Sequence, residues 1–197
     1  MEARKEVQFK LVLLGNSSVG KTSLINRFTK DEFTEFEEPT IGASFLTKKV
    51  QLDDGSTVKF DLWDTAGQER YKSLAPMYYK GAAAALVVFD VTAPESFEGA
   101  KDWVRELQQN APPSIIIALA GNKVDLGSRR VTADQGKELA QRHSLMYFEL
   151  SAKTGERVQE AFRELAKRLP KGQARKDLGV SLGQPAFKPA ASGGCCT

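Results

Sequence analysis

The chain has 197 residues, of which 41% are hydrophobic and 27% are charged, so it can form one domain with a single sizeable core and a short extension. Its net charge of +3 is not gathered into a basic stripe, which argues against nucleic-acid binding. The apolar runs at 82–89 and 115–120 are far shorter than the roughly 20 residues of a membrane-spanning helix, and no secretory leader is visible, so we expect a cytosolic chain.

Short apolar runs and stretches of helical periodicity alternate along the chain. We expect strands at 9–14, 45–52, 57–64, 83–90, 114–121 and 145–150. We expect helices at 21–29, 97–107, 132–143 and 158–169. The pair Asp54-Gly55 between the second and third strands predicts a hairpin, and the acidic, proline-containing stretch 31–41 predicts a loop.

Two sequences of the capping-box type mark expected helix starts, because a threonine is followed three residues later by Glu or Gln. Thr92 with Glu95 precedes one helix, and Thr132 with Gln135 precedes the next. In each case we expect the threonine side chain to accept a hydrogen bond from the first turn of the helix.

Strands that alternate with helices after one hairpin predict an α/β fold. We expect a six-stranded, mostly parallel sheet with one antiparallel edge strand and helices on both faces. Ligands of such sheets bind beyond the carboxyl ends of the strands, and every motif below follows an expected strand. We expect the domain to cover residues 1–170, and we expect residues 171–197, rich in Gly, Pro, Ala and Ser, to form a flexible tail.

The segment Gly15–Thr22 fits the pattern GxxxxGK[ST] between an expected strand and an expected helix, which is the context of a P-loop NTPase. Its glycines let backbone N–H groups point at phosphate oxygens, and the helix presents its positive end. Lys21 adds a charge at the β- and γ-phosphates, and the Thr22 hydroxyl is a hard ligand for Mg²⁺. The expected nucleotide contacts here are Ser17, Ser18, Val19, Gly20, Lys21, Thr22 and Ser23.

Asp64 ends the third expected strand and is followed by Thr-Ala-Gly67-Gln68. A carboxylate in this place can hold Mg²⁺, usually through water, and Gly67 can bring its N–H to the γ-phosphate. Taken alone the sequence is also a plausible turn, and its distance from Lys21 along the chain favours the nucleotide site.

Asn122, Lys123 and Asp125 follow the fifth expected strand. The Asp125 carboxylate can accept both N1–H and the exocyclic N2–H of guanine, whereas adenine would leave it unpaired, a mismatch worth about 10⁴–10⁵ in discrimination. The stem of Lys123 can lie along the ring. Ser151, Ala152 and Lys153 follow the sixth strand and can offer a backbone N–H to guanine O6.

In this order the four motifs resemble those of the Ras superfamily of small GTPases, and the resemblance covers about residues 9–169. It is closest to the Rab family in the stretches 41–45, 59–63, 70–75, 78–82 and 87–92. The stretches 40–47 and 73–81 are most similar to the early-endosomal branch of the Rab family.

The resemblance implies Mg²⁺ as cofactor, GTP and GDP as substrate and product, and Thr22, Thr40 and Asp64 as metal ligands or their positioners. Thr40 would also sense the γ-phosphate, Phe33 would stack on the guanine edge, and Gln68 would orient the attacking water. Phe45, Trp63 and Tyr78 would be the aromatic side chains that effectors read. Ser18 departs from the alanine or glycine common at its position.

The resemblance also implies a monomer that works with an exchange factor, a GTPase-activating protein, a GDP-dissociation inhibitor and effectors. Cys195 and Cys196 resemble the double-cysteine ending of Rabs, where both thiols carry geranylgeranyl groups. Two lipid chains anchor a protein stably and one does not. We therefore expect a switch on the cytoplasmic face of membranes, at early endosomes, with a cytosolic pool.

Two other functions share part of this pattern. A P-loop kinase or ATPase would share the phosphate loop, but it gives no reason for Asp125. A non-hydrolysing nucleotide-binding scaffold would have no use for Gln68 or Thr40.

Overall fold

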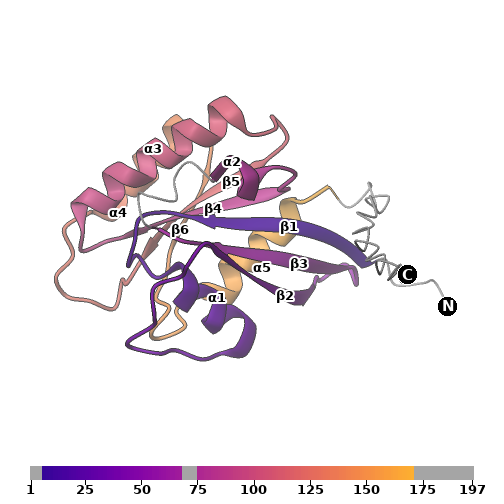
Figure 1. Ribbon diagram of the computed structural model, residues 1–197, viewed down its shortest axis with the longest axis horizontal. Helices are drawn as coiled ribbons and strands as arrows, with labels where there is room; N and C mark the ends of the chain where they lie inside the picture. Colours follow the sequence, from indigo (N-terminus) through magenta and orange to yellow (C-terminus); the bar gives the residue numbers. More distant parts are fainter. Residues whose placement is uncertain (1–5, 68–74, 171–197) are drawn as a thin grey trace, which may run out of the picture.

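The computed structural model describes residues 6–67 and 75–170. In that part of the chain a six-stranded sheet has the strand order β2-β3-β1-β4-β5-β6 (Figure 1). The strands are β1 (Glu6–Leu14), β2 (Ala43–Gln51), β3 (Thr57–Thr65), β4 (Ala84–Asp90), β5 (Ile116–Asn122) and β6 (Met146–Glu149). The edge strand β2 runs antiparallel to β3, and the other neighbours are parallel, so the predicted fold class is confirmed.

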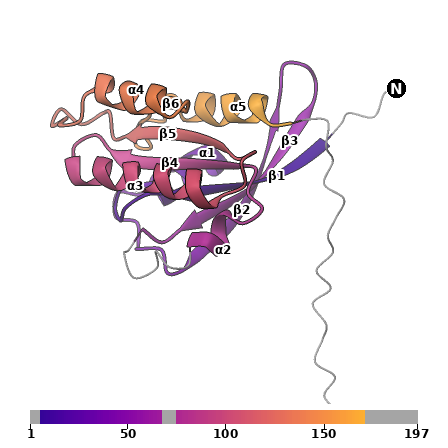
Figure 2. The same cartoon turned by 90° about the horizontal axis from the view of Figure 1, so that it is seen from above.

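Five helices accompany the sheet in the described residues: α1 (Lys21–Lys30), α2 (Ala75–Tyr79), α3 (Pro94–Asn110), α4 (Ala133–Arg142) and α5 (Val158–Arg168). Helices α1 and α5 pack on one face, and α3 and α4 pack on the other, as Figures 1 and 2 show from two directions. Each face therefore has its own apolar core, and the central strand β4 is buried along its whole length. No helix among these residues combines the length and the hydrophobicity that crossing a bilayer requires.

Two details of the helices differ from the sequence predictions. Helix α2 was not predicted, because five residues are too few to show a helical period. The capping box at Thr92 was also wrong: Ala93 is the N-cap residue, and the Thr92 hydroxyl donates to Asp90 instead, at 2.7 Å. Pro94 starts α3 because its ring already holds the helical φ angle.

The second capping box is confirmed. Thr132 accepts a hydrogen bond from the Gln135 backbone N–H at 3.2 Å, and the Gln135 side chain accepts one from the Thr132 N–H at 2.8 Å. The hairpin between β2 and β3 is likewise present, closed by the Leu52 N–H donating to the Ser56 carbonyl at 2.9 Å.

A stack of aromatic rings fixes α1 and α5 on the sheet. The rings of Phe28 in α1 and Phe162 in α5 lie parallel, with centroids 3.8 Å apart. Phe60 of β3 meets both rings edge-on at 6.4 Å. All three side chains are fully buried, so helix α1, which follows the phosphate loop, is positioned by close packing rather than by loop contacts.

Replacing Phe162 by alanine should lower the free energy of unfolding by about 3–5 kcal/mol, because it removes a buried ring and leaves a cavity between two helices. Urea denaturation in a fixed buffer measures the change. Met77→Ala is the control, since that side chain is 69% exposed, and it should change stability by less than about 0.5 kcal/mol. Equal effects of the two substitutions would contradict this description of the core.

Candidate functional site

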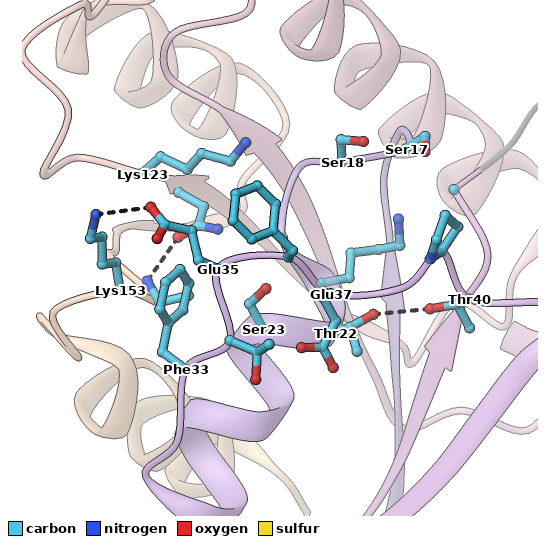
Figure 3. A pocket seen from close by; sticks show the side chains of 18 of the residues that line it. Ser17, Ser18, Thr22, Ser23, Phe33, Glu35, Glu37, Thr40, Lys123 and Lys153 are labelled. Atoms are coloured by element: carbon cyan, nitrogen blue, oxygen red, sulfur yellow. Dashed lines mark hydrogen bonds and ion pairs between the residues drawn. The ribbon is translucent and has the colours of Figure 1, made fainter.

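A cavity of about 720 Å³ opens at the carboxyl edge of the sheet, beyond β1, β3, β5 and β6. Most of the predicted nucleotide-binding residues line it: Ser17, Ser18, Gly20, Lys21, Thr22, Ser23, Phe33, Thr40, Gly67, Asn122, Lys123, Asp125, Ala152 and Lys153. Figure 3 shows Thr22 and Thr40 toward one end and Lys123, Lys153 and Phe33 toward the other. Val19, Asp64 and Ser151 do not line the cavity, and the last two act on residues that do.

The phosphate loop turns sharply at two glycines. Gly15 has φ +145° and lies so close to the Val88 carbonyl of β4 that a Cβ atom would collide with it. Gly20 has φ +93° and caps α1 without any side-chain hydrogen bond. The first N–H groups of α1 are thus left without a side-chain cap, which is the arrangement that binds anions at helix N-termini.

Lys21 is the buried cation of this loop. Its ammonium donates to the carbonyl oxygens of Gly15 at 2.8 Å and Asn16 at 2.9 Å. Burial lowers the pKa of Lys21 to about 8, and the nearby Asp64 carboxylate opposes that change. Two neutral carbonyl groups do not balance a buried positive charge, so the site favours an anion beside Lys21.

Three hard oxygen ligands meet next to Lys21. The hydroxyl oxygens of Thr22 and Thr40 lie 3.0 Å apart, and Asp64 Oδ2 accepts a hydrogen bond from Thr22 at 2.7 Å and from Thr40 at 3.2 Å. Asp64 is almost fully buried, and this burial raises the pKa of its carboxyl group. Its Oδ1 atom accepts no hydrogen bond from the described residues. Two hydroxyls and a carboxylate with an unused lone pair fit Mg²⁺.

Asn122 connects the two ends of the cavity. Its side-chain amide donates to the Val19 carbonyl of the phosphate loop at 2.8 Å, and its Oδ1 atom accepts from the Ala152 N–H at 3.1 Å. Both ends of the carboxamide therefore hold protein backbone. Asn122 is a brace between the phosphate loop and the segment Ser151–Lys153, a role that its sequence motif alone does not indicate.

Asp125 is held by Ser151 at the other end of the cavity. The Ser151 hydroxyl, which is fully buried, donates to Asp125 Oδ1 at 2.6 Å and so orients the carboxylate. Lys123 has φ +67° and pairs with Asp90 at 2.7 Å. This role of Asp90 was not predicted from the sequence, although Asp90 ends the buried strand β4, just as Asn122 ends β5.

The loop that precedes β2 forms one wall of the cavity. Phe33 packs against the core on the α1 and α5 side, and Glu35 lies 3.7 Å from the Lys153 ammonium. Further along the same loop, Phe36 is 90% and Ile41 is 82% exposed. Two large apolar side chains are thus open to solvent beside the site.

The structure brings two of the three predicted effector-reading aromatics into direct contact. The rings of Phe45 and Trp63 meet edge to face with centroids 5.7 Å apart, and the Lys10 ammonium lies 4.2 Å from the centre of the Trp63 ring. Tyr78 and Trp63 both pack against the core on the α3 side. Gln68, Cys195 and Cys196 lie outside the described residues.

A glycine-bounded loop that leads into a helix, a buried lysine and a hard-oxygen cluster define a nucleoside-triphosphate-binding protein of the P-loop class. Comparison with family models matches residues 10–171 to the Ras family. The chain belongs to the Ras family and is a small GTPase. Proteins of this family bind GTP and GDP, typically with Mg²⁺.

Asn122→Ala should weaken GDP binding roughly 10- to 100-fold, because the phosphate loop and the Ala152 segment both lose a buried hydrogen bond. Titration of a fluorescent GDP analogue measures the change. Asn110→Ala, at the exposed end of α3, is the matched control and should bind as the wild type does. Wild-type affinity in a folded Asn122→Ala variant would show that the brace has no part in binding.

Proposed function

We propose that this chain is a membrane-anchored GTP/GDP switch of the Rab type that recruits effectors in vesicle trafficking, at an early endocytic step. The observation that carries the switch is the position of Thr40. Its hydroxyl belongs to a loop, yet it joins Thr22 and Asp64 at the phosphate end of the cavity. A change in the phosphates therefore acts directly on that loop.

The cavity residues divide the work of binding. Asp125, oriented by Ser151, would accept hydrogen bonds from the guanine base, and Phe33 would stack on the edge of that base. Lys21 and the uncapped start of α1 hold the phosphates. Thr22, Thr40 and Asp64 would hold Mg²⁺, which supplies neutralisation of charge on the β- and γ-oxygens. Gly67 fits only as glycine, because a Cβ atom there would collide with the Asn16 carbonyl and the Lys21 ammonium.

Hydrolysis by this site alone should be slow. In this proposal the side chain of Gln68 orients the water molecule that attacks the γ-phosphate. No arginine is among the cavity-lining residues in the described ranges 6–67 and 75–170, so none of these residues offers an arginine finger beside Lys21. A GTPase-activating protein would then raise the rate by about 10³–10⁵.

The loop between α1 and β2 is the surface that partners would read. It presents Phe36 and Ile41 to solvent, and the strand β2 that follows it carries Phe45, whose ring contacts Trp63. Exposed apolar side chains that gather into one patch mark interaction sites. The Rab-like sequence at 41–45 and 59–63 supports effectors of the Rab kind, with an exchange factor and a GDP-dissociation inhibitor as further partners.

The tail supports membrane attachment. Cys195 and Cys196 would carry two geranylgeranyl groups, enough for stable anchoring on the cytoplasmic face of early endosomes. A flexible linker over residues 171–194 would span about 25–30 Å, so the domain could stand clear of the membrane.

Gln68→Leu should reduce single-turnover GTP hydrolysis at least about 10-fold and leave GTP affinity within about twofold, since it removes a water-positioning group and no phosphate contact. Phosphate release from preloaded protein measures the rate. Unchanged hydrolysis would remove Gln68 from the mechanism, and no hydrolysis by the wild type, with or without an activating protein, would favour a non-hydrolysing scaffold.

The full chain made in eukaryotic cells should exceed its sequence mass by two geranylgeranyl groups and should sediment with membranes. The double variant Cys195→Ser, Cys196→Ser should have the unmodified mass and remain in the cytosolic fraction. Intact-mass spectrometry and fractionation check both. A wild-type chain without added isoprenoid mass would defeat the anchoring proposal.

A further inference from the structure

Arg27 of helix α1 holds three backbone carbonyls with one guanidinium group. Its Nε donates to the Ala152 carbonyl at 2.9 Å, and its Nη2 donates to the Lys153 carbonyl at 2.8 Å. Its Nη1 donates to the carbonyl and to the carboxylate of Asp31, both at 2.9 Å. The Arg27 side chain is only 16% exposed; its bond to Ala152 is partly buried, and its bonds to Lys153 and Asp31 lie at the surface.

The segment that Arg27 holds is the one expected to face guanine O6. The Ala152 N–H is bonded to Asn122, and Ser151 just before it is bonded to Asp125. Ala152 and Lys153 thus have their backbone fixed from two directions: Asn122 acts on the side of the phosphate loop, and Arg27 acts from α1.

The third partner of Arg27 lies where the nucleotide-sensing loop begins. Asp31 ends α1 in the left-handed region at φ +60°, and the loop with Phe33 and Thr40 follows it. One side chain therefore joins the base-binding segment to the start of the loop that reaches the phosphate end.

We infer that Arg27 is a positioning residue for guanine, which sets the rate of nucleotide release by fixing the backbone of Ala152 and Lys153. The inference rests on the proposed function, because it takes the Asp125 end of the cavity as the base site. Arginine suits the task because its planar fork makes several directed hydrogen bonds at once, whereas a lysine ammonium is a single charge on a flexible stem.

A purely structural role is a weaker explanation of this geometry. Helix α1 is already held by the buried side chains of Leu24, Ile25 and Phe28, which do not depend on Arg27. The guanidinium is directed at loop carbonyls, and its one carboxylate partner, Asp31, is largely exposed and so adds little stability. Loss of Arg27 should loosen the loop that contains Ala152 and Lys153 and leave the fold intact.

The first test uses the full chain loaded with a fluorescent GDP analogue. Arg27→Ala should release it on the order of 10- to 100-fold faster than the wild type, as expected when charged hydrogen bonds to two carbonyls are lost. Arg27→Lys, which keeps the aliphatic stem, should release the analogue at a rate between those of the wild type and Arg27→Ala. Urea denaturation checks that both variants are folded.

Arg163→Ala is the matched control. Arg163 also reaches from a helix to a backbone carbonyl, that of Gln51 at 3.3 Å, and to a carboxylate, that of Asp53 at 3.4 Å, but it does so outside the cavity. Its removal should leave the release rate unchanged. Wild-type release from a folded Arg27→Ala variant would overturn the inference, and so would equal acceleration in the control.

The second test asks whether Arg27 acts through O6. An analogue of GDP with sulfur in place of O6 should bind the wild type more weakly than GDP, and this penalty should shrink in Arg27→Ala because the backbone of Ala152 and Lys153 is no longer held in place by the guanidinium group. The penalty for inosine diphosphate, which lacks the amino group read by Asp125, should be the same in both proteins. An unchanged sulfur penalty would overturn the positioning role.

The two failures can be told apart. If the wild type itself bound inosine diphosphate as tightly as GDP, the assignment of Asp125 to the base, and with it the proposed function, would fall. If the wild type discriminated and Arg27→Ala changed nothing, only the inference about Arg27 would fall.

Discussion

The site depends on two buried charges that the protein alone does not neutralise. Lys21 starts helix α1 and Asp64 lies near the end of strand β3, and both are almost fully removed from water. Burial is the largest effect on each, lowering the pKa of Lys21 and raising that of Asp64, and their mutual attraction offsets only part of it. We expect a ligand to supply the missing charges, a phosphate beside Lys21 and a cation beside Asp64.

Hydrogen bonds connect these two buried charges to the other segments of the site. Thr22 and Thr40 place their hydroxyls on Asp64, so the loop before β2 is tied to the charged end of the cavity. Asn122 ties the phosphate loop to the base-binding segment. Arg27 ties that segment back to α1 and to the start of the loop. In the proposed switch, short chains of hydrogen bonds would thus link the base site to the loop that contains Thr40.

Much of this arrangement could be predicted from the sequence, for definite reasons. Buried parallel strands such as β4 appear as continuous apolar runs, and turn and loop residues mark where they end. Because parallel strands share a carboxyl edge, the motifs after β1, β3, β5 and β6 had to meet there. The spacing around Lys21 and Asp125 was therefore enough to predict that most of the motif residues meet at one cavity, although Val19, Asp64 and Ser151 do not line it.

The features that were missed depend on three-dimensional context. Helix α2 is too short for a period, and Pro94 shifts the start of α3 past Thr92. The bracing function of Asn122 appears only when Val19 and Ala152 are seen on either side of it. Arg27 looks like any polar helix residue in the sequence, because two of its partners, Ala152 and Lys153, lie more than a hundred residues away.

We expect guanine nucleotide and Mg²⁺ together to supply the charges that Lys21 and Asp64 lack. The most direct measurement is the thermal unfolding midpoint of the nucleotide-free full chain, alone and with GDP plus Mg²⁺, GDP plus a chelator, or ADP plus Mg²⁺. GDP plus Mg²⁺ should raise the midpoint most, GDP with the chelator should raise it less, and ADP should raise it hardly at all. An equal rise with ADP, or no loss on chelation, would contradict this expectation.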